Sequence, residues 1–184
     1  MTDQDFSVRI KGIMSVSKRR IGSCDDFAHD MNESNVGGNT MKLTGIHIKN
    51  FKAIHEMKID SIENALILVG QNNTGKTTIL EAIRAAFGDY RISSEDFDGD
   101  CANIEMDLSL EFSIEDLKWL HQNGIVSQYK RYETWLEDFC KKLPSFSVNE
   151  GESGGVLQFT FIAHRDGWVR YQDGEHKNNS CIPQ

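Results

Sequence analysis

Long apolar runs and an excess of positive charge are both missing from this 184-residue chain. No apolar run approaches the length of a membrane-spanning helix, which needs about 18 residues. No apolar stretch has the form of a signal-peptide core. The net charge is −8 at pH 7, so we do not expect the chain by itself to bind the DNA backbone tightly and nonspecifically. These absences predict a cytoplasmic protein without a membrane partner.

Closely spaced cysteines are missing as well. The four cysteines lie far apart and form no C-x-x-C pair, and together with six scattered histidines they offer no zinc-binding spacing. We expect reduced thiols, as in a cytosol. With 39% hydrophobic and 26% charged residues, the composition is ordinary for a soluble protein with one core.

One stretch carries the clearest functional motif. Gly70–Thr77 reads GQNNTGKT and fits G-x-x-x-x-G-K-[ST] at every fixed position. Apolar Ala65–Val69 precedes it, and an amphipathic helical pattern follows as far as Phe87, with Gly88 as a stop signal. A buried strand, a glycine-containing loop and a helix are the context that a phosphate-binding loop (P-loop) requires.

The chemistry of such a loop explains its residues. Its backbone N–H groups form an anion-binding concavity, and a helix starting near Gly75 adds unpaired N–H groups and partial positive charge. Lys76 is expected to reach the β- and γ-phosphates, and the Thr77 hydroxyl to bind Mg²⁺. The sequence thus predicts ATP and Mg²⁺ as cofactors, Lys76 as the catalytic residue, Thr77 as the metal ligand, and a nucleotide site formed by Gly70, Gln71, Asn72, Asn73, Thr74, Gly75, Lys76, Thr77 and Thr78.

The rest of the chain divides into a tail and periodic segments. Residues 1–40 lack sustained periodicity and end in a linker-like composition, which predicts a mostly disordered extension. Alternating apolar residues predict strands, the clearest being Ile104–Phe112, and spaced apolar residues predict helices. The predicted strands are 43–51, 54–59, 65–69, 104–112 and a hairpin of 156–162 with 168–171; after the P-loop helix come a polar loop over 89–98 and helices over 114–122 and 127–143.

Three segments resemble known families. Met41–Lys52, with its Asn50-Phe51-Lys52 ending, resembles the opening strand of ABC-type ATPase heads of the SMC/RecF class. Gly70–Thr78, with a doubled Asn, is similar to the loop of the OLD (overcoming lysogenization defect) family of ATP-dependent endonucleases, and Ser93–Phe97 looks like the OLD continuation. The resemblance covers residues 41–112 well, and beyond them only as a compatible pattern.

The resemblance implies an α/β fold of the P-loop NTPase class: the N-terminal lobe of an ABC-ATPase-like head, with a mixed sheet and antiparallel strands, over residues 41–184. It implies ATP binding and hydrolysis coupled to DNA processing as an endonuclease, in repair or in phage defence, with DNA reached through the complete protein or a partner. It also implies a homodimer around nucleotide and, in OLD proteins, a C-terminal Toprim nuclease. Lys52 is expected near the nucleotide.

Some parts of that family pattern are absent from the sequence. An ABC head needs a signature loop, a Walker B run of four apolar residues followed by Asp-Glu, and a switch His. Ser153-Gly154-Gly155 resembles part of a signature, but a strand-like segment follows it, and Val156–Asp166 ends in Ala-His-Arg-Asp. No Toprim acidic cluster is visible. We therefore expect the N-terminal portion of a longer ATPase, which binds nucleotide but hydrolyses it very weakly or not at all.

Other P-loop classes remain as alternatives. A small P-loop kinase usually begins with the P-loop strand and carries an Arg-rich lid, whereas here two predicted strands come first. A GTPase would carry Asn-Lys-x-Asp, which does not occur. A catalytically dead nucleotide-binding fragment fits the missing second half.

Overall fold

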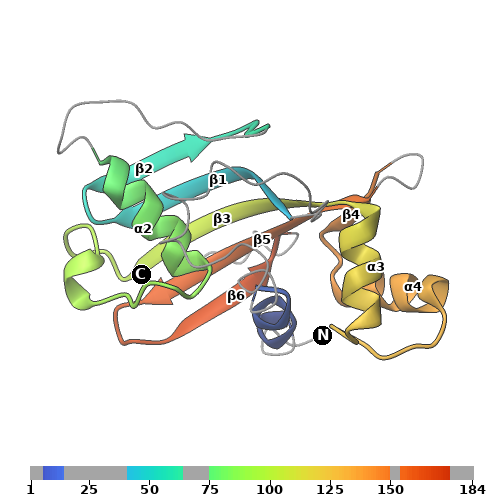
Figure 1. The fold of residues 1–184 in the computed structure, drawn as a ribbon. Coiled ribbons are helices and arrows are strands. Elements are labelled where there is room, and N and C mark those ends of the chain that lie inside the picture. The colour runs from blue at the N-terminus through green and yellow to red at the C-terminus, as the bar shows by residue number, and fades with distance from the viewer. Residues whose placement is uncertain (1–5, 15–40, 64–74, 150–153, 175–184) are drawn as a thin grey trace, which may run out of the picture.

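The computed structural model describes residues 6–14, 41–63, 75–149 and 154–174, and every structural statement below concerns these residues. They form one antiparallel sheet with helices against one face and at one end (Figure 1). In this part of the chain, no helix is long and apolar enough to cross a membrane.

The sheet has six strands. Five of them follow the order β2-β1-β3-β5-β4, and the sixth, β6, also pairs with β5. β6 pairs with residues 159–163 of β5 and β4 with residues 155–157, so the two short strands lie end to end along the same edge of β5. Every described pair is antiparallel. The bounds are β1 Lys42–Phe51, β2 Ile54–Ile59, β3 Asn103–Phe112, β4 Phe146–Val148, β5 Gly155–His164 and β6 Val169–Asp173.

The centre of the sheet follows directly from the sequence pattern. Along β3, every apolar residue of the predicted alternation is buried and every polar residue between them is half-buried. This division places one face of the strand on the core and the other toward solvent. The strands predicted over 43–51, 54–59, 104–112 and the hairpin of 156–162 with 168–171 are confirmed.

β1 departs from simple alternation at two places. Its register against β3 shifts between Leu43 and Gly45, where a bulge interrupts the ladder. Asn50 has a left-handed backbone with φ 58°, and this residue ends the alternation. Ile46 and Ile48 are therefore buried at even positions, whereas Phe51 is buried at an odd one.

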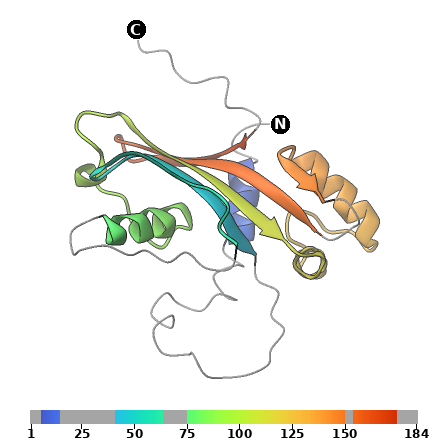
Figure 2. The same ribbon diagram turned by 90° about the horizontal axis from the view of Figure 1, so that it is seen from above.

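Helix α2, Lys76–Ala86, lies against one face of the sheet (Figure 2). It buries Ile79, Ala82, Ala85 and Ala86. The Tyr171 hydroxyl of β6 donates a hydrogen bond of 2.8 Å to the Ala86 carbonyl, which joins the end of the helix to the edge of the sheet. The predicted P-loop helix is thus present from Lys76 onward.

Helices α3, Ile114–Gln122, and α4, Tyr132–Lys142, form a pair at the far end of the sheet (Figure 1). α3 matches its predicted range. α4 begins five residues later than the predicted Ser127, because Ser127 instead bonds side chain to side chain with Asp138 and Lys142 of α4. A 3₁₀ turn, η2 (Ser94–Asp96), lies within the predicted polar loop.

The prediction of disorder over residues 1–40 is wrong for residues 6–14, which form a helix. This N-terminal helix lies below β6, between α2 and the α3–α4 pair (Figure 1). Phe6, Ile10, Ile13 and Met14 are buried in the same core as the sheet. A helix of about two and a half turns is too short for periodicity to reveal, and its stability comes from tertiary packing.

The sequence analysis did not predict β4, because a three-residue strand close to Pro144 carries too little pattern. The predicted strand Ala65–Val69 and the loop residues Gly70–Thr74 lie outside the described residues.

Candidate functional site

The first candidate site is the start of α2, where the glycine-rich motif ends. Gly75 is the N-cap of the helix and has a left-handed backbone with φ 83°. Among the described residues, a Cβ added at Gly75 would meet no atom within 4 Å, so the positive φ is the observed reason for a glycine at this position. Lys76, Thr77 and Thr78 form the first turn, with Thr77 exposed and the other two half-buried.

The start of α2 differs from the starts of α3 and α4 in its electrostatics, because α4, which also lacks a side-chain cap, carries Glu133 in its first turn. α3 has a capping box in which Ser113 and Asp116 satisfy each other's backbone N–H groups, and Glu115 adds a second acid in the first turn. At α2, no described side chain caps the helix, and no acidic residue lies in the first turn. Without an acidic residue in the first turn, the positive end of the helix dipole favours an anion at this helix start.

The predicted site residues divide into two groups. Gly75, Lys76, Thr77 and Thr78 lie together at the N-cap and first turn of α2. The remaining five, which are Gly70, Gln71, Asn72, Asn73 and Thr74, lie outside the described residues. Among the residues that are described, no three His, Cys, Asp or Glu side chains are placed to hold a metal ion.

Lys52 lies beside α2, where it belongs to a cluster with Glu81, Asp96 and Tyr90. Its Nζ atom is 2.7 Å from Glu81 Oε2 and 3.5 Å from Asp96 Oδ1. The same ammonium lies 5.0 Å from the centre of the Tyr90 ring, close enough for a cation–π contact. The Tyr90 hydroxyl donates 2.8 Å to Asp96 Oδ1.

The cluster keeps both of its main charges. Burial alone would lower the pKa of Lys52, but the hydrogen bonds and charges of Glu81 and Tyr90 raise that pKa above its usual value. Burial would raise the pKa of Asp96, yet hydrogen bonds from Ser93 and Tyr90 and the charge of Lys52 lower it. At neutral pH the Lys52 ammonium and the Asp96 carboxylate are therefore both ionised.

Sequence reasoning reached Lys52 only through the family resemblance and missed its partners. Glu81 lies 29 residues away from Lys52, and no local pattern connects them. The one available signal was the Ser93…Asp96 spacing of a capping box, which the structure shows at η2.

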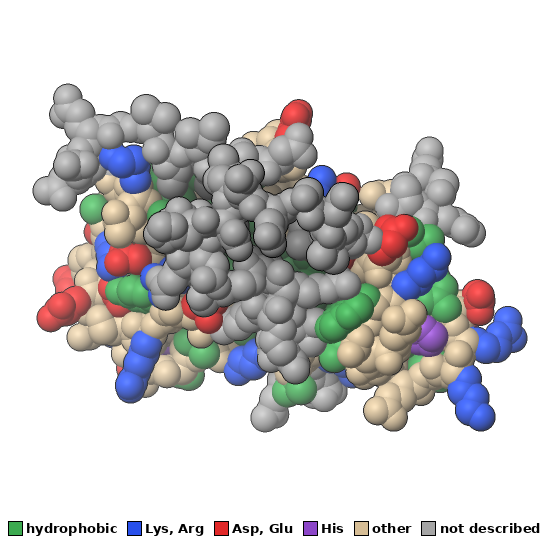
Figure 3. All heavy atoms as spheres, viewed as in Figure 1, with side chains coloured by type: hydrophobic (Ala, Val, Ile, Leu, Met, Phe, Trp, Pro, Cys, Tyr) green, Lys and Arg blue, Asp and Glu red, His purple; other side chains and the backbone are tan. Residues whose placement is uncertain are grey.

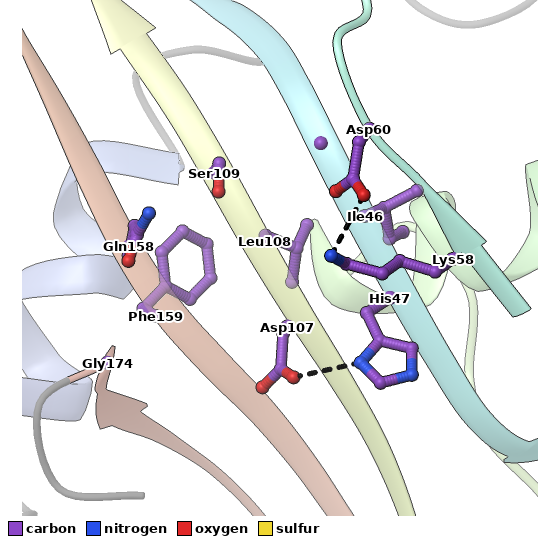
Figure 4. Close-up of a pocket in the computed structure, with 11 residues that line it drawn as sticks. Ile46, His47, Lys58, Asp60, Asp107, Leu108, Ser109, Gln158, Phe159 and Gly174 are labelled. Atoms are coloured by element: carbon purple, nitrogen blue, oxygen red, sulfur yellow. Dashed lines mark ion pairs between the residues drawn. The ribbon is translucent and has the colours of Figure 1, made fainter. Parts of the chain in front are cut away.

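A second candidate is a pocket of about 200 Å³ on the opposite face of the sheet (Figure 4). His47 lies between two carboxylates, with Nε2 2.8 Å from Glu56 Oε1 and Nδ1 3.4 Å from Asp107 Oδ2. Thr160 donates 2.6 Å to the other Asp107 oxygen. These side chains bond mainly to one another across the strands, so the pocket has a structural explanation in cross-strand pairing.

Comparison with known families identifies the class. The profile of the AAA ATPase domain family matches residues 41–165, more than half of the chain. The chain therefore belongs to the AAA ATPase domain family, and the predicted ATPase class, with an α/β P-loop NTPase fold, is confirmed.

Relatives of known name match shorter stretches. Over 43 residues the chain is 54% identical to the DNA replication and repair protein RecF of Lactococcus lactis subsp. lactis (strain IL1403), a match that covers 23% of this chain and 12% of RecF. Over 79 residues it is 30% identical to the retron Ec83 probable ATPase of Escherichia coli, which covers 41% of this chain and 15% of that protein. The matched region thus spans less than a sixth of either relative.

Two solved structures are also similar. One is an SMC ATPase from work on ATP-driven dimerization and DNA-stimulated activation, with a TM-score of 0.43, 19% identity, and coverage of 71% of this chain and 68% of that one. The other is the recombination mediator RecF bound to ATP, with a TM-score of 0.44, 16% identity, and coverage of 81% and 30%.

Proposed function

We propose that this chain is the ATP-binding head of a RecF-, SMC- or OLD-like ATPase. The observation that carries the proposal is the start of α2: the P-loop motif ends in a left-handed Gly75, and Lys76 opens a helix without an acidic residue in its first turn. The positive end of that helix would favour a nucleoside triphosphate. Membership of the AAA ATPase domain family supports the same reading.

Different residues of the site would bind different parts of magnesium-ATP. Backbone N–H groups at Gly75 and Lys76 would hold phosphate oxygens, and the Lys76 ammonium would neutralise the β- and γ-phosphates. Thr77, exposed on the first turn, would supply a hydroxyl oxygen to Mg²⁺, a cation that prefers such ligands. When bound, the ion neutralises phosphate charge. The loop residues Gly70–Thr74 would complete the cradle.

We further propose a role in DNA processing, as repair, phage defence or an endonuclease, that the complete protein performs in the cytoplasm. The support is similarity to RecF, which is named as a DNA replication and repair protein. The charge of −8 opposes direct DNA binding by this chain. Figure 3 shows Lys and Arg side chains interspersed with Asp and Glu over the described part of one face. DNA contact therefore requires further segments or a partner, and a homodimer around nucleotide is the assembly we expect.

Isothermal titration calorimetry with magnesium-ATP tests the binding site. We expect saturable heat with the natural chain and a loss of affinity on the order of 10- to 100-fold or more in Lys76→Ala, because hydrogen bonds to charged groups are removed. Lys118→Ala, which changes an exposed lysine of α3, is the matched control and should bind normally. No heat from a folded natural chain, or full affinity in Lys76→Ala, would refute the assignment.

Hydrolysis is a separate expectation. The sequence contains no Walker B Asp-Glu and no signature loop, so phosphate release should be very weak or absent even when ATP binds. A phosphate-release assay on the chain, with Lys76→Ala as background, measures it. Turnover above about 1 s⁻¹, within the usual range for enzymes, would contradict this expectation and show that the missing groups are supplied elsewhere.

A further inference from the structure

The turn that presents Lys52 adopts a backbone that most residues avoid. Asn50 and Lys52 are both left-handed, with φ of 58° and 52°, a conformation that raises the energy of L-residues other than glycine. Backbone bonds hold the turn against the segment after α2: Lys52 N–H donates 2.7 Å to the Asp96 carbonyl, and Asp98 N–H donates 3.1 Å to the Asn50 carbonyl. Such strain persists only where surrounding contacts enforce it, often at functional sites.

The strained turn places the Lys52 ammonium against α2 and not toward solvent. Glu81 of α2 binds it at 2.7 Å, and the carboxylate of Asp96 follows at 3.5 Å. Asp96 is only 3% exposed and is itself held by Tyr90 and Ser93. One cation thus lies between two carboxylates, one on the P-loop helix and one on a buried, fixed turn.

The position of Glu81 connects this cluster to the candidate nucleotide site. Glu81 is four residues after Thr77 on the same helix, so the two side chains lie on one face, about 5–6 Å apart at their Cβ atoms. The ion pair therefore lies one helical turn from the hydroxyl that is proposed to bind Mg²⁺. At that distance a change of one charge alters the affinity for a polyphosphate.

We propose that Glu81 and Asp96 are positioning residues that hold and neutralise the Lys52 ammonium beside the Thr77 face of α2, and that Glu81 thereby lowers the affinity of the site for a nucleoside triphosphate. This inference rests on the proposed function and adds a restraint within the same site. Asp96 anchors the ammonium, and Glu81 sets how much of its positive charge the phosphates experience. The ligand class is a polyphosphate, so the effect should grow with the number of phosphates.

The test is a double-mutant cycle of Glu81→Gln and Lys52→Met, with magnesium-ATP and AMP as ligands in calorimetry. Glu81→Gln should tighten magnesium-ATP by about 3- to 10-fold and change AMP less. In the Lys52→Met background, Glu81→Gln should tighten magnesium-ATP less than in the natural chain. Glu95→Gln, which removes an exposed charge in η2 without touching Lys52, is the matched control and should leave both affinities unchanged.

Several outcomes would overturn the inference. Equal tightening by Glu81→Gln with and without Lys52 would show a plain charge effect, and unchanged or weaker binding at an unchanged Tm would show a merely structural ion pair. If Glu81→Gln lowers the Tm sharply, the single variant Lys52→Met provides the test instead. Several-fold weaker binding of magnesium-ATP by Lys52→Met supports the proposal, and unchanged binding refutes it. Binding that depends on Lys76 but not on Glu81 refutes only this inference, whereas no binding by the natural chain refutes the proposed function as well.

Discussion

Individual side chains in this protein join elements that are far apart in the sequence. Tyr171 is the clearest case, because its ring lies in the core and its hydroxyl reaches the Ala86 carbonyl, 85 residues away. Burial raises the pKa of Tyr171 to about 12. The neutral phenol is thus the form that the folded protein favours, and the hydrogen bond to α2 requires it.

Tyr171 therefore predicts a loss of stability in alkaline solution. Its folded pKa lies above the unfolded value, so its contribution is present below about pH 10 and is lost as the pH rises through about 12, by up to about 2–3 kcal/mol. Tyr171→Phe should cost about 1 kcal/mol at pH 7 and flatten the alkaline decline. Urea unfolding from pH 7 to 11 measures both effects. Tyr129→Phe, at an exposed tyrosine, should keep the natural profile, and an unchanged slope in Tyr171→Phe would contradict the prediction.

At the scale of elements, the starts of α2 and α3 differ in how they are capped. α3 closes its N-terminus with its own residues: the Ser113 hydroxyl accepts from Asp116 N–H at 3.1 Å, and Asp116 accepts from Ser113 N–H at 2.9 Å. At α2, no side chain of the residues that the structure describes caps the N-terminus, and no acidic residue lies in the first turn. A helix that only stabilises the fold gains from a capping box, whereas a helix that receives an anion must keep its first N–H groups available.

The cap of α3 can be tested by itself. Ser113→Ala removes one partner of the capping box and should lower the free energy of unfolding by about 1 kcal/mol. Thr134→Ala, an exposed threonine inside α4, serves as the control and should change stability by no more than about 0.5 kcal/mol. Chemical denaturation followed by circular dichroism gives both values. Equal stability of Ser113→Ala and the natural chain would show that the cap contributes nothing.

At the scale of the whole molecule, one apolar core runs from the N-terminal helix to β6. It includes Phe6 and Ile10 from residues that precede the matched family region, which begins at residue 41. The N-terminal helix covers part of the core beside α2 and β6, and the core of this chain is therefore not confined to the family region.

This arrangement predicts that the N-terminal helix stabilises the domain. Ile10 is fully buried, and Ile10→Asp places a carboxylate in the core, so we expect a loss of about 3 kcal/mol or more, or release of the helix. Val8, 66% exposed on the same helix, provides the control, because Val8→Asp should stay within about 0.5 kcal/mol. Thermal unfolding and limited proteolysis of residues 6–14 report the two effects. Resistance of Ile10→Asp to both would mean that the helix is dispensable.

The sequence by itself determined the elements whose pattern is local. β3, α3 and the start of α2 follow from alternation, a capping box and a glycine motif, each of which acts over a few residues. The class of protein also followed from short motifs, since a phosphate site is built mainly from consecutive backbone groups.

Tertiary structure alone decided what depends on distant partners. The N-terminal helix and β4 are too short to show a period in the sequence. The helix is stabilised by packing on the core, and β4 by pairing with the edge of β5. Lys52 meets Glu81 and Asp96 only because β1, α2 and η2 converge. Charges so far apart along the chain carry no mutual signal in the sequence, because their interaction energy depends on a separation in space that folding alone creates.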